Sequence, residues 1–480
     1  MQNKQLFLKT AAILAVAVIC VFGQNSKIGP FQAGPLTWQI QNSVLTITGE
    51  GDMPNYGETG SHAAPWAQYK TQIAVIEIGD EVTSIGSAAF YEHSYTFVVN
   101  IGKSVKSIGA SAFYNCRFIE GLILPNSVET IGRMAFNNCD FLAGELIIPN
   151  SVTLIDDNAF TACSLLTKLT LGSSVETIGK LAFNGCKRLA GDLIIPESVS
   201  QIYAGAFFSC GKLTGTLTVP NATIGMEAFG RCGFSSVTLG ANVPSIGVGA
   251  FYYCNNLTSF NYNCINADYT YDDYEERTDE GLFKGSYNLT QLNIGDGVTN
   301  IPGNTFLWCR NIKELDIPAS VTEIGSTAFW GWEGLTKITN RAPMPQTIVS
   351  EAFKDVNMSN VKLYVSAEAL GLYQTTNVWK NFDVAAIGSE VYIMNRVAAN
   401  KIVSISFAGI ENGQINVNLK AGEYVAELYN IQGRLVGNVN INATHGVNAT
   451  RLKTDNLGNG MFILNVKQAG VSVLKQKIKI

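Results

Sequence analysis

A phenylalanine returns at a nearly constant interval through most of this 480-residue chain. The interval is 22 to 24 residues everywhere except for one of 32 residues between Phe251 and Phe283. Such a period is typical of solenoids, in which each repeat is one rung that cannot bury its apolar side alone. The chain is therefore expected to stack about twelve rungs. The twelve residues are Phe90, Phe113, Phe136, Phe160, Phe183, Phe207, Phe229, Phe251, Phe283, Phe306, Phe329 and Phe353.

Residues 146–166 show how one rung is built. Leu146–Ile148 predicts a short strand, which Pro149 ends because proline has no amide hydrogen for a ladder. Val152 and Ile155 then turn inward, and Ala159-Phe160 predicts a short helical or 3₁₀ turn. Stacked rungs would join these apolar residues into one continuous core.

A glycine usually follows the second inward residue of a rung. Gly132, Gly179 and Gly325 hold this position, which predicts a left-handed turn there. Asp156 and Tyr203 replace the glycine in two rungs, so the positive φ is expected as a preference.

The repeat S-V-x-x-I-G-x-x-A-F-x-x-C-x-x-L over about 73–355 resembles the BspA-like leucine-rich repeats of bacterial surface proteins. This resemblance implies an α/β-type solenoid, a leucine-rich repeat array of about 12 units. Segment 24–72 resembles the N-terminal cap of that family and is expected to cover the edge of the first rung. Its matching residues are Trp38, Gly49, Gly51, Met53, Pro54, Tyr56, Pro65 and Trp66. Segment 356–388 resembles the closing cap, although Ser366 stands where proline is usual.

Eight of the ten cysteines follow a repeat phenylalanine by three residues. Neighbouring rungs would bring their Cα atoms within disulfide range, but the Cβ vectors would run parallel and could not converge. His93, Ser286, Trp332 and Val356 replace cysteine in other rungs, which no pairing scheme explains. Free, buried thiols are therefore expected. A thiolate zinc site is not, since the thiols would form a line.

The first 23 residues predict an export signal. Lys4 and Lys9 precede the apolar run 11–22, and Val21 and Gly23 suit a cleavage site after residue 23. A single-pass anchor is the alternative, but the run is short for a bilayer. Cys20 leaves a lipoprotein signal open, although Ile19 is bulky for that pattern. The mature chain is thus expected to be secreted or held at the cell surface.

One residue of each long strand should point away from the core. The middle positions give a row with an apolar centre and polar ends, and we take its central members as candidate binding residues. The alternative is that β-branched residues merely suit strands. The candidates are Ile123, Ile147, Thr170, Ile194 and Thr218; the polar ends are Glu77, Asn100, Thr238, Asn261, Asn293 and Asp316.

The single long interval contains the acidic, tyrosine-rich insertion 264–281. Insertions in solenoids leave the stack as surface loops, which often serve binding. Tyr269, Tyr271 and Tyr274 are therefore further candidates for contact with a partner. A calcium site and a plain solvated loop remain alternatives, although no EF-hand spacing is present.

The sequence gives little support for catalysis. It has three histidines and no nucleophile elbow, zincin motif or phosphate loop, so no catalytic residue, metal site or cofactor is expected. Paired carboxylates for glycoside cleavage remain possible from spacing alone. The net charge of −5 argues against a nucleic-acid partner.

Residues 389–480 differ from the array in pattern and charge. They alternate as strands without a repeat and hold ten basic against five acidic residues, which predicts a small all-β sandwich domain. Segments 427–436 and 457–466 and the final lysine-bearing strand resemble the sorting domain of the type IX secretion pathway. This resemblance implies recognition by an outer-membrane export machine. An ordinary accessory module is the alternative.

Together these features predict an exported, non-enzymatic repeat protein, expected to be monomeric. The resemblance implies adhesion to host or neighbouring-cell proteins, with extracellular-matrix proteins as typical targets. A structural envelope component and the scaffold of a carbohydrate-processing protein are the alternatives.

Overall fold

The structure is a computed structural model that describes residues 27–270 and 281–387 and, beyond residue 405, the strands of a second unit. The chain divides into two compact units, Met1–Ala385 and Ala386–Ile480. The predicted export signal lies outside the described residues. So does most of the insertion, with Tyr271 and Tyr274.

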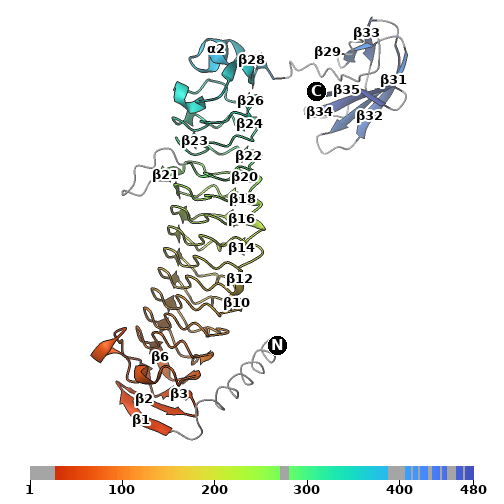
Figure 1. Ribbon diagram of the computed structural model, residues 1–480. Helices are drawn as coiled ribbons and strands as arrows, with labels where there is room; N and C mark the ends of the chain where they lie inside the picture. The colour runs from red at the N-terminus through yellow and green to blue at the C-terminus, as the bar shows by residue number, and fades with distance from the viewer. Residues whose placement is uncertain are drawn as a thin grey trace. The chain divides into compact units, whose positions relative to one another are not determined.

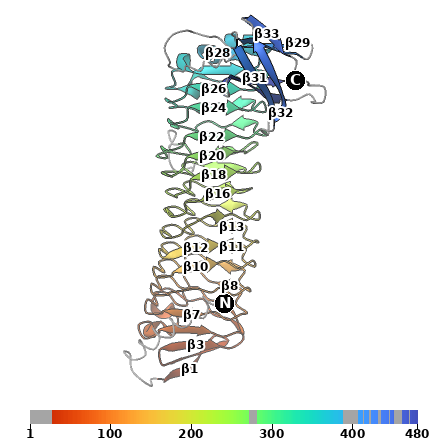
Figure 2. The same cartoon turned by 90° about the vertical axis from the view of Figure 1, so that its right-hand side faces the viewer.

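The first unit is a solenoid whose rungs have a longer strand, a short strand and a turn side, except that the rung of Ile123 has no regular strand on the first of these sides (Figure 1). The longer strands form what we call the long-strand face, and consecutive members of each sheet pair in parallel along the stack (Figure 2). The solenoid of stacked rungs predicted from the sequence is confirmed. The long strands are β5 (Val75–Ile78), β7 (Val98–Asn100), β10 (Gly144–Ile147), β12 (Leu166–Thr170), β14 (Leu193–Ile194), β16 (Thr216–Val219), β18 (Ser236–Leu239), β20 (Ser259–Tyr262), β22 (Gln291–Ile294), β24 (Glu314–Ile317) and β26 (Lys337–Asn340).

The second side, the short-strand face, was not foreseen as a sheet. Its strands have two to four residues, and ten of them join in one parallel sheet from β4 to β21. They are β4 (Gly51–Asp52), β6 (Val82–Ile85), β8 (Ser107–Ile108), β9 (Thr130–Ile131), β11 (Leu154–Ile155), β13 (Thr177–Ile178), β15 (Gln201–Ile202), β17 (Thr223–Ile224), β19 (Ser245–Gly247), β21 (Asp268–Thr270), β23 (Asn300–Ile301) and β25 (Glu323–Ile324).

The turn side carries the repeat phenylalanines into the core. Phe136, Phe160 and Phe183 are fully buried, and their rings stack at centroid distances of 5.2 and 5.4 Å with nearly parallel planes. Around Phe160 the chain makes successive tight turns, as when the Cys163 amide donates to the Phe160 carbonyl, in place of the expected helical turn. Helix content is therefore low for an α/β-type solenoid.

The left-handed turn predicted at Gly132, Gly179 and Gly325 is wrong. Positive φ occurs two residues later, at Met134 (56°), Leu181 (57°) and Thr327 (60°). The glycines serve a different purpose, because a Cβ on Gly179 would lie 2.5 Å from the amide nitrogen of Asp157 in the preceding rung. Stacking at this position needs a bare backbone.

The cysteine row confirms the expectation of free, buried thiols. Seven of the thiols donate to the phenylalanine carbonyl of the preceding rung, which the sequence did not reveal; Cys163 Sγ, for example, donates to the Phe136 carbonyl (3.2 Å). Where cysteine is replaced, Ser286 Oγ and Trp332 Nε1 donate to the matching carbonyl (2.8 and 2.6 Å). Burial raises the pKa of the Cys254 thiol to about 12, so this row is unreactive.

Caps close both ends of the stack. At the N-terminal end β3 pairs with β5, and Trp66 stacks on Phe90 (5.7 Å), as expected for a segment that covers the first rung. At the other end Trp379 and Phe382 pack edge-on against Phe353. The caps contain β1 (Lys27–Ala33), β2 (Leu36–Gln41), β3 (Val44–Thr48), η1 (Gly60–His62), η2 (Ala67–Tyr69), η3 (Ser350–Phe353), η4 (Met358–Asn360), β27 (Lys362–Val365), α2 (Leu370–Thr375), η5 (Trp379–Asn381) and β28 (Asp383–Ala386).

The second unit has two antiparallel sheets, as a small sandwich requires. One has the order β29-β30-β33 and the other β32-β31-β34-β35. Its strands are β29 (Ser406–Glu411), β30 (Gln414–Leu419), β31 (Gly422–Asn430), β32 (Leu435–Ala443), β33 (Gly446–Thr450), β34 (Met461–Gln468) and β35 (Val471–Lys479). In neither unit do the described residues include a helix that is long and apolar enough to span a bilayer.

Candidate functional site

The long-strand face carries the apolar row that the sequence predicted to point outward. Ile123, Ile147 and Ile194 are 58, 56 and 78% exposed. Thr170 and Thr218 are exposed as well, and the strand register sets them opposite Ile147 and Ile194. Ile123 lies outside the regular strands, but like Ile147, Ile194 and Thr218 it stands two residues before a proline of its rung, so the repeat gives these residues equivalent outward positions. We call the five residues the isoleucine row.

An ion pair borders the isoleucine row. Lys168 Nζ lies 2.7 Å from Glu145 Oε1, and the Thr170 hydroxyl donates to the same carboxylate (3.1 Å). The hydrogen bond from Lys168 lowers the pKa of Glu145, so the carboxylate stays charged. The row is therefore an apolar strip with a charged rim, an arrangement found in protein interfaces.

Toward the C-terminal end the outward row becomes a ladder of polar side chains. Asn261 Nδ2 donates to the Thr238 hydroxyl (2.8 Å), and Asn293 Nδ2 donates to Asn261 Oδ1 (2.7 Å). These side chains hydrogen-bond to one another along the stack. Fewer of their donors and acceptors are therefore free to bind a partner than the composition of this stretch suggests.

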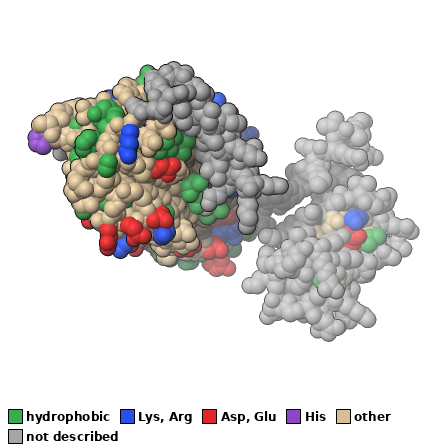
Figure 3. Space-filling view, turned by 90° about the horizontal axis from the view of Figure 1, so that it is seen from below, with side chains coloured by type: hydrophobic (Ala, Val, Ile, Leu, Met, Phe, Trp, Pro, Cys, Tyr) green, Lys and Arg blue, Asp and Glu red, His purple; other side chains and the backbone are tan. Residues whose placement is uncertain are grey.

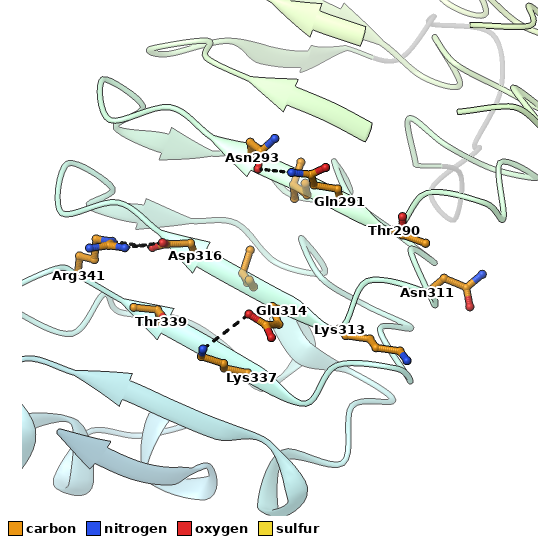
Figure 4. Close-up of a pocket in the computed structure, with 12 residues that line it drawn as sticks. Thr290, Gln291, Asn293, Asn311, Lys313, Glu314, Asp316, Lys337, Thr339 and Arg341 are labelled. Atoms are coloured by element: carbon orange, nitrogen blue, oxygen red, sulfur yellow. Dashed lines mark hydrogen bonds and ion pairs between the residues drawn. The ribbon is translucent and has the colours of Figure 1, made fainter. Parts of the chain in front are cut away.

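Beyond Asn293 the face opens into a groove of about 770 Å³ (Figure 4). It lies where β22 and β24 belong to separate sheets. Apart from Leu292 and Leu315, which are largely buried, the residues that line the groove have polar side chains. The others are Thr290, Gln291, Asn293, Asn311, Lys313, Glu314, Asp316, Lys337, Thr339 and Arg341.

Both carboxylates in the groove are engaged by cations. Arg341 binds Asp316 with two nitrogens (2.8 and 2.6 Å), and this hydrogen bonding raises the pKa of Arg341. Lys337 lies 3.6 Å from Glu314 (Figure 4). The groove can therefore bind polar groups through its amides and hydroxyls, while each of its two carboxylates faces a cation. Asp316 belongs to the outward row expected from the sequence, whereas no pattern pointed to Arg341, because the arginine lies beyond the strand positions that define the row.

The predicted tyrosines do not join the isoleucine row. Tyr269 is on β21 of the short-strand face, opposite Ile246, where it is half-buried and packs against the core. Tyr271 and Tyr274 lie outside the described residues. Within residues 27–270 and 281–387, no three potential metal ligands gather at one point.

The N-terminal end of the array presents a surface of mixed charge (Figure 3). Seen from below, the N-terminal end shows acidic and basic side chains next to one another along one edge, with hydrophobic ones scattered over the rest (Figure 3). Asp80 and Lys103, which pair at 3.0 Å, illustrate such neutralised surface charge.

The family comparisons match both units. Residues 66–190, 190–272 and 276–378 match the BspA type leucine rich repeat region, and residues 411–480 match the secretion system C-terminal sorting domain. No curated protein matches the chain. Among solved structures, a leucine-rich repeat protein from Bacteroides ovatus is 21% identical with a TM-score of 0.49, covering 75% of this chain and 99% of its own. A leucine rich cell surface protein from Faecalibacterium prausnitzii is 24% identical with a TM-score of 0.35, covering 71% of this chain and 95% of its own.

Proposed function

Because the chain belongs to the BspA type leucine rich repeat proteins and ends in a secretion system sorting domain, we propose that it binds a protein partner through the isoleucine row. The two matches mark it as an exported protein of the cell surface or the medium, and the sorting domain implies contact with the type IX secretion machinery. The partner class that we propose is a host or extracellular-matrix protein, bound by a monomeric chain.

The observation that carries this proposal is the exposure of three isoleucines in one row. A fully covered isoleucine contributes about 1.5–3 kcal/mol relative to an exposed one, so a strip of several can hold a partner firmly. The rigid stack keeps these side chains in place before binding, which reduces the entropy that association costs. Multiple contacts along such a face are how repeat proteins bind.

Catalysis is not part of the proposal. His62 is exposed in the N-terminal cap, and His93 is fully buried. The groove acids Glu314 and Asp316 are held by cations and are poor candidates for proton transfer.

The test replaces Ile147 and Ile194 together by lysine. We expect the affinity for matrix proteins or host cells to fall at least about tenfold, with an unchanged Tm, since both positions are exposed. The matched control is Thr153→Lys with Ser200→Lys, two exposed positions of the same rungs beside β11 and β15. An equal loss of affinity in the test variant and the control variant would contradict the proposal that the isoleucine row is the contact surface. A chain that shows no saturable binding would instead favour a structural envelope component.

The insertion needs a separate test. Removing residues 271–279 leaves Thr270 four residues before Phe283, the spacing that Gly132 and Phe136 show in a regular rung. If the insertion contributes to contact, this deletion weakens binding while Tyr269 and β21 remain. Unchanged binding would remove the insertion from the proposal and leave the isoleucine row as the contact surface.

A further inference from the structure

Four cations near the middle of the array stand in one patch without a carboxylate partner. Lys187, Arg188, Lys212 and Arg231 are all exposed, and none forms an ion pair within the described part of the chain. This is unusual because residues 24–388 hold 33 acidic against 21 basic residues.

The regular stack places Lys187, Arg188 and Lys212 together, and Arg231 lines a hollow with Gly211, the chain neighbour of Lys212. Cys186, Cys210 and Cys232 occupy the same column of successive rungs, and each donates to the phenylalanine carbonyl one rung back. Residues that follow them by one or two positions therefore form two further columns. Arg188 and Lys212 are neighbours in one of these columns, about 5 Å apart along the stack by the rung spacing. Like charges at that spacing repel each other unless an anion separates them.

The same columns elsewhere supply internal controls. Arg117, one residue after Cys116, lies 4.0 Å from Asp140 of the next rung. Arg310, one residue after Cys309, lies 3.8 Å from Glu333 of the next rung. At both ends of the array a cation one residue after the cysteine thus has an acid one rung on, whereas Lys187, which holds the same position, has Gly211 there.

A hollow of about 470 Å³ adjoins the patch. It forms because one rung is short: the chain takes five residues from Cys232 to Val237 but seven from Cys210 to Leu217, although Val237 and Leu217 pair in the sheet. The lining residues are Gly211, Arg231, Cys232, Gly233, Tyr253, Asn255 and Asn256. Two of them are glycines, so bare backbone forms part of the wall.

The groups around this hollow are suited to a sugar. The Arg231 guanidinium lies over the rings of Phe208 and Tyr253 (5.4 and 5.9 Å to the centroids), which orients its planar donors. Tyr253, which also lines the hollow, is 40% exposed. Its backbone has a φ of 50°, which is a costly conformation for a bulky residue. Asn255 and Asn256 are exposed and carry both a donor and an acceptor for hydroxyl groups.

We propose that this hollow and the four cations form a binding site for an acidic polysaccharide. Arg231 lies over the Tyr253 ring and Gly285 packs against it, so Tyr253 would present its ring edge and hydroxyl to a sugar. The asparagine amides would bind the sugar's hydroxyls, and the cations would bind sulfate or carboxylate groups on neighbouring residues of the polymer. The site lies at the turn side and does not depend on the isoleucine row.

The test measures binding of the exported chain to immobilised heparin, hyaluronan, neutral dextran and double-stranded DNA. We expect saturable binding to heparin or hyaluronan, and the comparison of the two identifies sulfate or carboxylate as the preferred anion. Replacing Lys187, Arg188, Lys212 and Arg231 by glutamine should lower that affinity at least about tenfold. The control neutralises four paired cations by K103Q, R117Q, R310Q and K362Q and should change affinity less than about twofold.

A second variant separates a sugar site from a bare charged patch. Tyr253→Gly keeps the cations and suits the positive φ, since Gly185, Gly285 and Gly331 hold the same position in other rungs. It should weaken polysaccharide binding without lowering Tm. The proposal is overturned if neither polysaccharide binds, if DNA binds as tightly, if the control loses as much affinity as the test variant, or if Tyr253→Gly binds as the original chain does.

Discussion

The regular middle of the array and the rungs beside the insertion use the same repeat, yet they stack differently. From Phe113 to Phe229 neighbouring rings lie 5.1 to 5.5 Å apart. From Phe251 through Phe283 and Phe306 to Phe329 the distances are 6.0, 6.2 and 6.1 Å. The ring stack is therefore looser across the insertion and over the two rungs that follow it.

The backbone shows the same difference. In the middle the amide of Phe160 donates to the carbonyl of Ala182 one rung on (2.8 Å), whereas beside the insertion Leu282, and not Phe283, donates to Thr305. Both faces also break at this level, since β21 and β23 belong to separate sheets, as do β22 and β24. In a solenoid each rung is held by its neighbours, so a weak interface decides where the stack opens first.

The largest expected effect on stability comes from removing one phenylalanine ring in the regular middle and, in a second variant, one ring beside the insertion. Phe160→Ala should lower the free energy of unfolding by about 4 kcal/mol, because the ring is fully buried between close neighbours. Phe306→Ala should cost less, since its neighbours already lie farther away. Urea denaturation of the two variants measures both values. An equal or larger cost at Phe306 would contradict the idea of a loose interface.

The N-terminal rung differs from the middle in having a histidine in the cysteine column. Burial lowers the pKa of His93 from 6.5 to about 4. As the pH falls through 6.5, the unfolded chain takes up a proton that the folded chain does not, so stability falls between about pH 6.5 and 4 and then levels off. The loss amounts to about 3 kcal/mol. His93→Cys, which restores the residue of the other rungs, should remove this dependence in pH-resolved denaturation, while His62→Gln should leave it. A His93→Cys chain with the same slope would refute the assignment.

Deleting most of the insertion should remove the difference in stacking between the regular middle and the rungs beside the insertion, without removing a core side chain. Deleting residues 271–279 restores the regular interval before Phe283, so we expect the rungs of Phe283 and Phe306 to stack more closely. Hydrogen exchange of amides such as that of Leu282 should then slow about tenfold, which corresponds to about 1.4 kcal/mol. Amides of the regular rungs, for example that of Phe160, serve as the reference. If exchange beside the deletion stays as fast as before, the insertion is not the cause of the loose stacking.

The sequence predicted those features that recur in every rung. The phenylalanine interval gave the ring stack, and the cysteine spacing gave the free thiols, because a period repeated twelve times leaves few alternative folds. The two-residue strands of the short-strand face were missed, since Val152 and Ile155 mark inward positions but carry no alternation. Gly132 was misread because glycine serves both positive φ and close approach, and the sequence does not distinguish them. The groove escaped prediction because Asp316 and Arg341 meet only through the stacking of different strands. The isoleucine row as a binding surface stays a prediction.

The smallest expected effect concerns the thiol donors of the regular rungs. Cys163→Val removes the hydrogen bond to Phe136, whose carbonyl still accepts from the amide of Cys139, and fills the site with a somewhat larger apolar side chain. Because that carbonyl keeps one partner, the cost should be about 0.5–1 kcal/mol. Val356, which ends the column, shows that the chain tolerates this side chain there. Denaturation of Cys163→Val against Cys163→Ala measures the effect: alanine also leaves a void and should cost more. If the valine variant loses as much stability as the alanine variant, the shared loss of the hydrogen bond, and not the packed volume, explains why cysteine fills this column. Thiol donation would then contribute more to the stability of the stack than the geometry indicates.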